Sequence, residues 1–192
     1  MKYVSTNQEA DPVSFSTAAL QGLAPDGGLY VPKDWPRLSE RFLANLGNES
    51  LQDIGFEVSR LFVDELDNGV LKKVVDDALN FDAPLVKLTE TEKVLELFHG
   101  PTLAFKDFGA RFMSRLFSAL RKETDQDLII LAATSGDTGS AVAQGFLDVE
   151  GIKVCLLYPS SKVSHIQEQQ LTTAGQNVTA LEIDGTFDDC QK

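Results

Sequence analysis

The chain has 192 residues and a mass of 21.0 kDa, with 43% hydrophobic and 24% charged residues, which is typical of one large globular domain or two small ones. Its 29 acidic and 17 basic residues give a formal net charge of −12. This charge argues against a protein that binds nucleic acid or an anionic membrane surface, because both are bound chiefly through cationic side chains.

The first part of the chain predicts a largely helical N-terminal domain. A turn at 26–28 (Asp-Gly-Gly) precedes a short extended run at 29–31. Ser50 and Asp53 have the spacing of a capping box, and the apolar residues that follow recur at helical intervals. This pattern predicts a helix over 51–66.

A second apolar stripe at 70–79 predicts another helix, and the character of the sequence changes soon after it. Apolar runs then alternate with glycine-rich turns. We place a boundary near Ala83, which predicts an N-terminal domain over 1–83 and a second domain over 84–192.

The second domain predicts strands that alternate with helices. An extended run at 94–98 precedes a helix from Phe105 onward, and the elements after it are a buried strand at 127–134, a helix at 138–147, a buried strand at 152–158, a helix at 163–174 and a strand at 178–183. This alternation indicates βαβ units and an open parallel sheet, so the predicted fold class is α/β.

The end of the chain predicts an incomplete crossover. Thr186 and Asp189 have the spacing of a helix cap, but the helix that they announce is cut off at Lys192. We therefore expect the chain to be a fragment of a longer protein, with apolar surface of the unfinished sheet available for self-association.

The first stretch that could carry chemistry is FHGPTLAFKDF, in which Lys106 lies at the start of a predicted helix. A helix N-terminus disfavours an ammonium group, and the neighbouring Phe105 and Phe108 would exclude water from it. A neutral lysine amine can attack an aldehyde and form a Schiff base. The alternative from these residues alone is a surface lysine beside Asp107.

The second stretch is AATSGDTGSA, between a predicted strand and a predicted helix. Small residues let the backbone approach a ligand closely, and helix N–H groups together with hydroxyl groups suit a carboxylate or a phosphate. The lysine that a Walker loop requires is absent. The alternative is an ordinary strand–helix turn whose glycines serve only its geometry.

The third stretch is YPSSKVSHIQEQQ, which follows the next strand and should open at the same edge of the sheet. Its Lys162 is either an anion contact or a solvated surface charge. The two histidines and two distant cysteines of the chain predict no metal site and no disulfide framework. Because the sequence contains no secretory signal and no apolar run long enough for a membrane span, we expect a cytoplasmic protein.

In this order, the three stretches resemble the threonine synthase family, in its bacterial and fungal type with an extra N-terminal domain. VSFSTAALQGLAPDGGLYVP resembles the opening of that family, FHGPTLAFKDFGARFM its cofactor-lysine segment and ATSGDTGSA its substrate loop. YPSSKVSHIQEQQ resembles a segment that usually has glycine where Ser161 stands. The resemblance covers essentially all 192 residues.

The resemblance implies a pyridoxal 5′-phosphate enzyme of fold type II, a carbon–oxygen lyase that converts O-phospho-L-homoserine and water to L-threonine and phosphate. It implies that Lys106 holds the cofactor as an internal aldimine and later moves protons, with Phe105 and Asp137 beside the cofactor. It implies a substrate site formed by Thr134, Ser135, Gly136, Asp137, Thr138 and Lys162. The cofactor-phosphate loop of the family lies further along the chain, so we do not expect this fragment to catalyse alone.

Two other interpretations remain. The parent protein could be another lyase of fold type II, such as an amino-acid dehydratase, or a non-catalytic homologue that binds a phosphorylated ligand. The N-terminal domain and its APDGGLYVP segment favour the threonine synthase family over a dehydratase, and Lys106 argues against a purely structural module.

Overall fold

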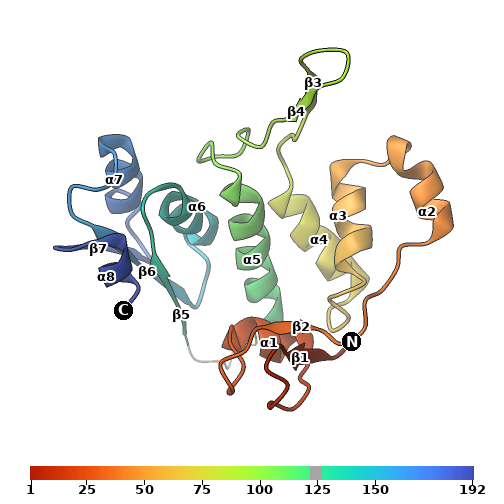
Figure 1. The fold of residues 1–192 in the computed structure, drawn as a ribbon, viewed down its shortest axis with the longest axis horizontal. Helices are drawn as coiled ribbons and strands as arrows, with labels where there is room; N and C mark the ends of the chain where they lie inside the picture. The colour runs from red at the N-terminus through yellow and green to blue at the C-terminus, as the bar shows by residue number, and fades with distance from the viewer. Residues whose placement is uncertain (122–126) are drawn as a thin grey trace. The chain divides into compact units, whose positions relative to one another are not determined.

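The structure is a computed structural model that describes residues 1–121 and 127–192. It divides into two compact units, Met1–Asp76 and Asp77–Lys192, and Figure 1 follows the chain through them from red to blue. The domain boundary proposed near Ala83 lies a few residues after this division and stays a prediction.

The first unit joins a two-stranded antiparallel sheet, in which Tyr3 pairs with Pro32, to short helices. Its elements in chain order are β1 (Tyr3–Ser5), α1 (Phe15–Gln21), β2 (Tyr30–Pro32), α2 (Glu40–Asn45), a 3₁₀ turn (Leu46–Asn48), α3 (Leu51–Ser59) and α4 (Asn68–Ala78), which ends just inside the second unit.

One carboxylate organises the N-terminal loops of the first unit. Asp26 Oδ1 accepts hydrogen bonds from Ser5 Oγ at 2.7 Å and from the Gly28 amide at 2.9 Å. Its Oδ2 accepts from the amides of Glu9 and Ala10 at 3.0 and 3.1 Å. These bonds, led by that from Ser5, hold the pKa of Asp26 below its usual range. The predicted turn is therefore tied to the first strand by its own aspartate.

The helix predicted over 51–66 begins as expected but is shorter. Ser50 Oγ caps it by accepting from the Asp53 amide at 3.0 Å, yet α3 ends at Ser59. Beyond that point the amides of Leu61 and Phe62 bond to carbonyls three residues earlier, and the Phe62 carbonyl accepts a hydrogen bond from the Tyr3 hydroxyl at 2.8 Å. Periodicity missed this end because the contact comes from the far end of the unit.

The second unit contains the predicted parallel sheet, of order β5-β6-β7, in which Leu128 pairs with Ile152 and Val154 with Val178. Its elements are β3 (Leu85–Lys87), β4 (Lys93–Leu95), α5 (Lys106–Leu120), β5 (Leu128–Ala133), α6 (Asp137–Phe146), β6 (Ile152–Pro159), α7 (His165–Thr172), β7 (Val178–Ile183) and α8 (Phe187–Cys190). The predicted α/β class and its βαβ connections are confirmed.

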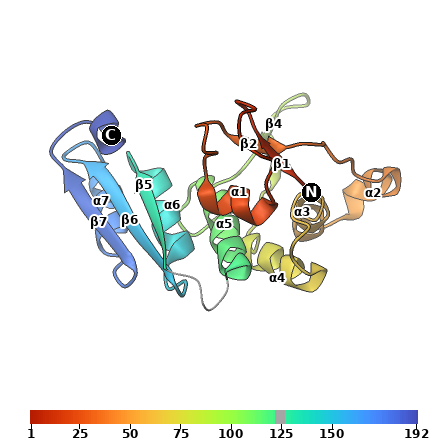
Figure 2. The same cartoon turned by 90° about the horizontal axis from the view of Figure 1, so that it is seen from below.

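The central strand carries the core, whereas the edge strand is only half covered. On β6, the side chains of Ile152 and Leu156 are 2% and 0% exposed, and α6 packs against β6 and β5 (Figure 2). On β5, Ile129 and Leu131 are 64% and 67% exposed. The expectation of a fully buried strand at 127–134 is therefore wrong, because alternate side chains of β5 face opposite sides and only one side is covered.

Helices α5 and α6 pack closely against each other. A Cβ atom on Gly145 would come within 3.1 Å of the Ala110 carbonyl, so the approach of α6 depends on the missing side chain. Arg115 bridges the helices by donating to the Gly145 carbonyl at 3.0 Å and to Ser114 Oγ at 2.8 Å. Burial first, and then the charge of Arg111, lower the pKa of the Arg115 guanidinium.

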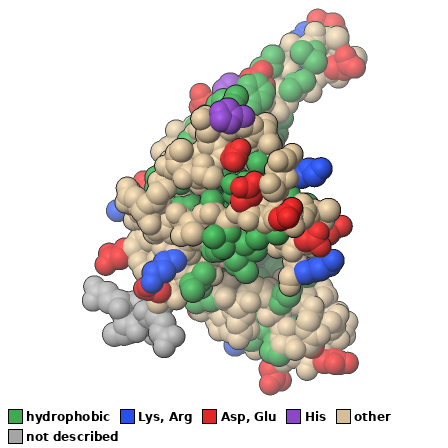
Figure 3. Space-filling view, turned by 90° about the vertical axis from the view of Figure 1, so that its left-hand side faces the viewer, with side chains coloured by type: hydrophobic (Ala, Val, Ile, Leu, Met, Phe, Trp, Pro, Cys, Tyr) green, Lys and Arg blue, Asp and Glu red, His purple; other side chains and the backbone are tan. Residues whose placement is uncertain are grey.

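The β3–β4 hairpin exposes apolar side chains, among them Leu85, Leu88 and Leu95 at 53–65% exposure. Figure 3 shows hydrophobic side chains at the surface near its top, where the hairpin lies. Over the described residues, no helix combines the length and the apolar character needed to cross a membrane, and no cluster of metal-ligating side chains is present.

We predict that Leu156→Ala lowers the free energy of unfolding by about 2–5 kcal/mol, because it leaves a cavity in the fully buried central strand. Leu131→Ala is the matched control on the exposed side of β5 and should change this free energy by no more than about 0.5 kcal/mol. Urea unfolding followed by circular dichroism measures both, and equal effects would contradict the assigned core.

Candidate functional site

The loop that follows β5 is shaped by a buried hydroxyl. Thr134 is 1% exposed, and its Oγ1 accepts hydrogen bonds from the amides of Gly136 at 3.0 Å and Gly139 at 2.8 Å. It also donates to the Gly136 carbonyl at 3.1 Å. The sequence places Thr134 among the ligand-facing residues, whereas the structure commits its hydroxyl to holding the first turn of α6 at the end of β5.

Gly136 and Gln167 bring the loops after β5 and β6 together. Gly136 has φ of 142°, a conformation that favours glycine, and the Gln167 side chain fills the space where a Cβ atom would lie. Gln167 Nε2 donates to Asp137 Oδ1 at 2.7 Å, while its Oε1 accepts from the Ser164 amide at 3.1 Å. The second and third stretches therefore meet at one sheet edge, as predicted.

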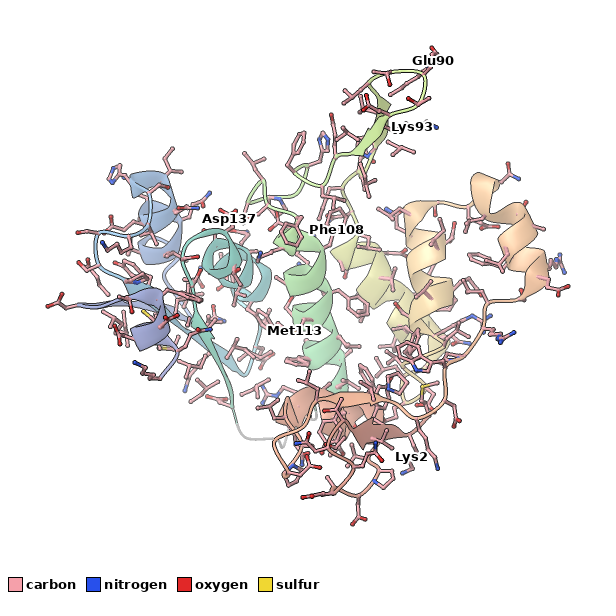
Figure 4. All side chains as sticks on the ribbon, viewed as in Figure 1. Lys2, Glu90, Lys93, Phe108, Met113 and Asp137 are labelled. Atoms are coloured by element: carbon pink, nitrogen blue, oxygen red, sulfur yellow. The ribbon has the colours of Figure 1, made fainter. Side chains whose placement is uncertain are left out.

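The start of α6 offers groups that can bind an anion. Ser135 and Asp137 are exposed and Thr138 is half-buried. The first amides of a helix have no partner within the helix, and its N-terminus carries partial positive charge. The negative charge of the Asp137 carboxylate repels an anion at this point, but its hydrogen bond with Gln167 directs Oδ1 toward α7 (Figure 4).

Lys106 is the first residue of α5, where the sequence analysis places it. Its Nζ lies 4.2 Å from the centre of the Phe105 ring, so Phe105 contacts the amine as expected. The Phe108 ring instead packs against Phe81, with ring centres 4.6 Å apart. Of the two aromatic neighbours proposed to cover the amine, one therefore contacts it and the other anchors α5.

A buried carboxylate stands directly after the lysine. Asp107 is 0% exposed, and it accepts hydrogen bonds from the Thr102 amide at 2.9 Å and from the Thr102 hydroxyl at 2.7 Å. Between the two, Leu103 has φ of 61°, a left-handed conformation that costs a residue with a side chain about 1–2 kcal/mol. The two hydrogen bonds between Thr102 and Asp107 span this turn.

Lys106 and Thr138 line the same open groove, which has a volume of about 580 Å³. The groove lies where the first turns of α5 and α6 approach each other (Figure 4). Its other lining residues are apolar or glycine: Leu97, Phe105, Phe108, Gly109, Ala110, Met113 and Val142. The structure thus unites the lysine of the first stretch with a hydroxyl of the second in an apolar setting.

Lys162 is placed differently. It is exposed in the loop after β6 and is not among the residues that line the groove. The preceding Ser161 has φ of 58°, which explains why glycine suits this position in the sequences that it resembles.

The two histidines lie elsewhere. His99 Nε2 lies 2.7 Å from Glu96 Oε2, and His165 is the first residue of α7 and is exposed.

Sequence analysis gave no task to Thr102 or Gln167 and considered Asp107 only as a surface neighbour of Lys106, whereas the structure buries it. An acidic residue in the first helical turn is common, so Asp107 carried no special signal. Gln167 did carry one, since Ser164 and Gln167 form a capping box at the start of α7. The contact from Gln167 to Asp137 depends on the sheet and is not visible in the spacing.

The chain is similar to proteins of one family. Residues 2–79 match the family model described as threonine synthase N terminus. Over its whole length, the chain is 39% identical to the threonine synthase of Buchnera aphidicola subsp. Baizongia pistaciae, and the match covers 45% of that protein. It is 42% identical to the threonine synthase of Haemophilus influenzae, and this match covers 44% of that protein. The chain thus spans less than half the length of the curated relatives that it matches.

Solved structures agree with these matches. The crystal structure of threonine synthase from Escherichia coli matches 100% of this chain, over 44% of its own, with a TM-score of 0.89 and 39% identity. A PLP-bound threonine synthase from Brucella melitensis matches 100% of this chain, over 43% of its own, with a TM-score of 0.92 and 39% identity. The fold described above therefore corresponds to the first part of these enzymes.

We predict that Thr134→Val destabilises the protein by about 1–3 kcal/mol, because it leaves the buried amides of Gly136 and Gly139 without their acceptor. Thr179→Val, on the exposed side of β7, is the matched control and should stay within about 0.5 kcal/mol of the unmodified chain. Thermal unfolding compares them. A Thr134 variant as stable as the control would contradict the role given to this hydroxyl.

Proposed function

We propose that the protein carrying this chain, which corresponds along its whole length to the N-terminal part of threonine synthases, converts O-phospho-L-homoserine and water to L-threonine and phosphate. The observation that carries this proposal is the groove shared by Lys106 and Thr138 at the first turns of α5 and α6. An amine and an anion-binding helix start at one groove suit an amino-acid substrate.

The groove fits the aldehyde end of pyridoxal 5′-phosphate, the cofactor that we propose. Lys106 provides a primary amine among apolar side chains, which keep water away from a bond between amine and aldehyde. The volume of about 580 Å³ lies within the range of roughly 300–1,000 Å³ found for small-molecule sites. When bound, this cofactor supplies an electron sink for proton removal next to the substrate amine.

Each residue of the candidate site then has a proposed task. Lys106 Nζ would hold the cofactor and, once released, would take protons from Cα and Cβ of the substrate and return protons at Cγ and Cα. The start of α6 binds the substrate carboxylate through its amides and the hydroxyls of Ser135 and Thr138. Phe105 and Asp137 lie beside the cofactor.

The remaining substrate contacts come from the loops. Gly136 lets the backbone approach the carboxylate, Thr134 holds that loop in shape, and Lys162 supplies positive charge toward an anionic group of the substrate. The ester C–O bond at Cγ breaks as phosphate leaves, Cγ takes up the proton that makes it a methyl group, and the hydroxyl of water adds at Cβ in place of the proton lost there.

We also propose a cytoplasmic setting and a small-molecule partner. The net charge of −12 supports the absence of a nucleic-acid partner. Ile129 and Leu131, which are exposed on β5, support self-association of the 192-residue chain when it is produced alone.

We predict that borohydride reduction of the full-length protein with its cofactor places a pyridoxyl group on Lys106, as read by peptide mapping. Lys106→Ala should abolish turnover, because no other residue of the groove has an amine. Lys162→Ala is the control and should keep the label. A label on another lysine, with none on Lys106, would refute the assignment.

We predict that Ser135→Ala raises the Michaelis constant for O-phospho-L-homoserine while the cofactor absorbance stays as in the unmodified protein. The reason is that an exposed hydroxyl at the carboxylate site is lost and the amine of Lys106 is untouched. Steady-state kinetics and absorbance spectra test this. An unchanged Michaelis constant would favour a plain strand–helix turn.

A further inference from the structure

A fully buried carboxylate next to the groove lysine in the chain has no task in the proposed reaction. Asp107 follows Lys106 directly, is 0% exposed and contacts Thr102 through both of its oxygens. A buried carboxylate is retained only where hydrogen bonds compensate its lost hydration. Both of these hydrogen bonds come from Thr102, in the loop that precedes Lys106.

The geometry of that loop depends on the pair. Leu103 lies inside it with φ of 61°, and its side chain is 72% exposed, so packing of the leucine does not hold the backbone there. The hydrogen bonds that span this turn are one from the Leu103 amide to the Gly100 carbonyl at 3.1 Å and two from Thr102 to Asp107. A strained backbone persists only where its surroundings over-determine it.

The strained turn leads straight into the lysine. The Asp107 amide donates to the Ala104 carbonyl at 3.0 Å, which starts α5 with Phe105 as its N-cap. The Phe105 ring then contacts Lys106 Nζ. A loop that reopened at Leu103 would move the start of the helix, and with it the ring and the amine.

We propose that Asp107 is a positioning residue: through its two hydrogen bonds to Thr102 it closes the turn at Leu103 and aims the Lys106 amine into the groove. This inference rests on the proposed function, because it assigns how the cofactor lysine is oriented. Asp107 is fully buried and is not among the residues that line the groove, so it acts through Lys106.

The test compares Thr102→Val with Thr102→Ser in the full-length protein. Valine keeps the shape of threonine and the amide bond but loses the hydroxyl that donates to Asp107 Oδ1, whereas serine keeps both donors. Thr89→Val is the control, since the Thr89 hydroxyl also donates to a carboxylate, that of Glu92 at 3.1 Å, in the turn of the exposed hairpin.

The measured quantity is the rate at which cofactor-free protein takes up pyridoxal 5′-phosphate, with the label on Lys106 quantified after borohydride reduction. We expect Thr102→Val to lower this rate by about 10- to 100-fold, because a displacement near 1 Å has effects of that size. Thr102→Ser and Thr89→Val should keep the rate of the unmodified protein. Restoration by serine separates positioning from a general loss of structure.

The other outcomes count against the inference. If the unmodified protein is labelled on Lys106 and Thr102→Val is labelled equally fast, the positioning role fails while the proposed function stands. If the unmodified protein is not labelled on Lys106 at all, the proposed function is refuted, and this inference, which rests on it, is refuted as well. If Thr102→Val does not fold, Asp107→Asn is measured in the same way. Asparagine keeps one carbonyl acceptor and loses the charge, so this variant should also lower the labelling rate, and an unchanged rate would refute the positioning role.

Discussion

The close approach of α5 and α6 at Gly145 is the constraint on which the candidate site depends. The Ala110 carbonyl occupies the space beside Gly145, and Arg115 bridges the two helices at the same level. A Cβ atom at Gly145 would require the neighbouring backbone at Ala110 to give by a few tenths of an ångström, and close-packed interiors leave little room for such shifts. With the helices held in this way, Lys106 and Thr138 line a single groove.

Both loops at this groove use the same physical device. A buried polar side chain accepts hydrogen bonds from the adjoining turn, and the exposed groups beside it stay available for a ligand. Thr134 does this after β5 and Asp107 does it before α5. Gln167 extends the device to a third element by holding Asp137 from α7. At the buried Thr134 and Asp107, breaking a hydrogen bond leaves a polar group unpaired away from water, which favours a single geometry, whereas the Gln167–Asp137 bond is exposed to solvent.

Local patterns predicted many elements of both units, because capping and hydrophobic period act over short distances along the chain. The cap at Ser50, the capping box at Thr186 and the apolar runs of β6 and β7 identified elements that the structure contains. The failures came from distant contacts. The end of α3 follows a bond from Tyr3, and the exposure of β5 follows from the covering of one sheet face only.

The amino-acid sequence by itself determined the α/β class, the alternation of strands and helices, and the resemblance carried by the segments around Lys106 and Ser135. Capping, turn chemistry and hydrophobic period are properties of neighbouring residues, so they can be read from the chain directly. Only the tertiary structure decided that Lys106 and Thr138 share a groove, that Thr134 faces inward, and that Asp107 is buried. These facts depend on how helices pack and on which groups lose contact with water, and neither is set by spacing along the chain.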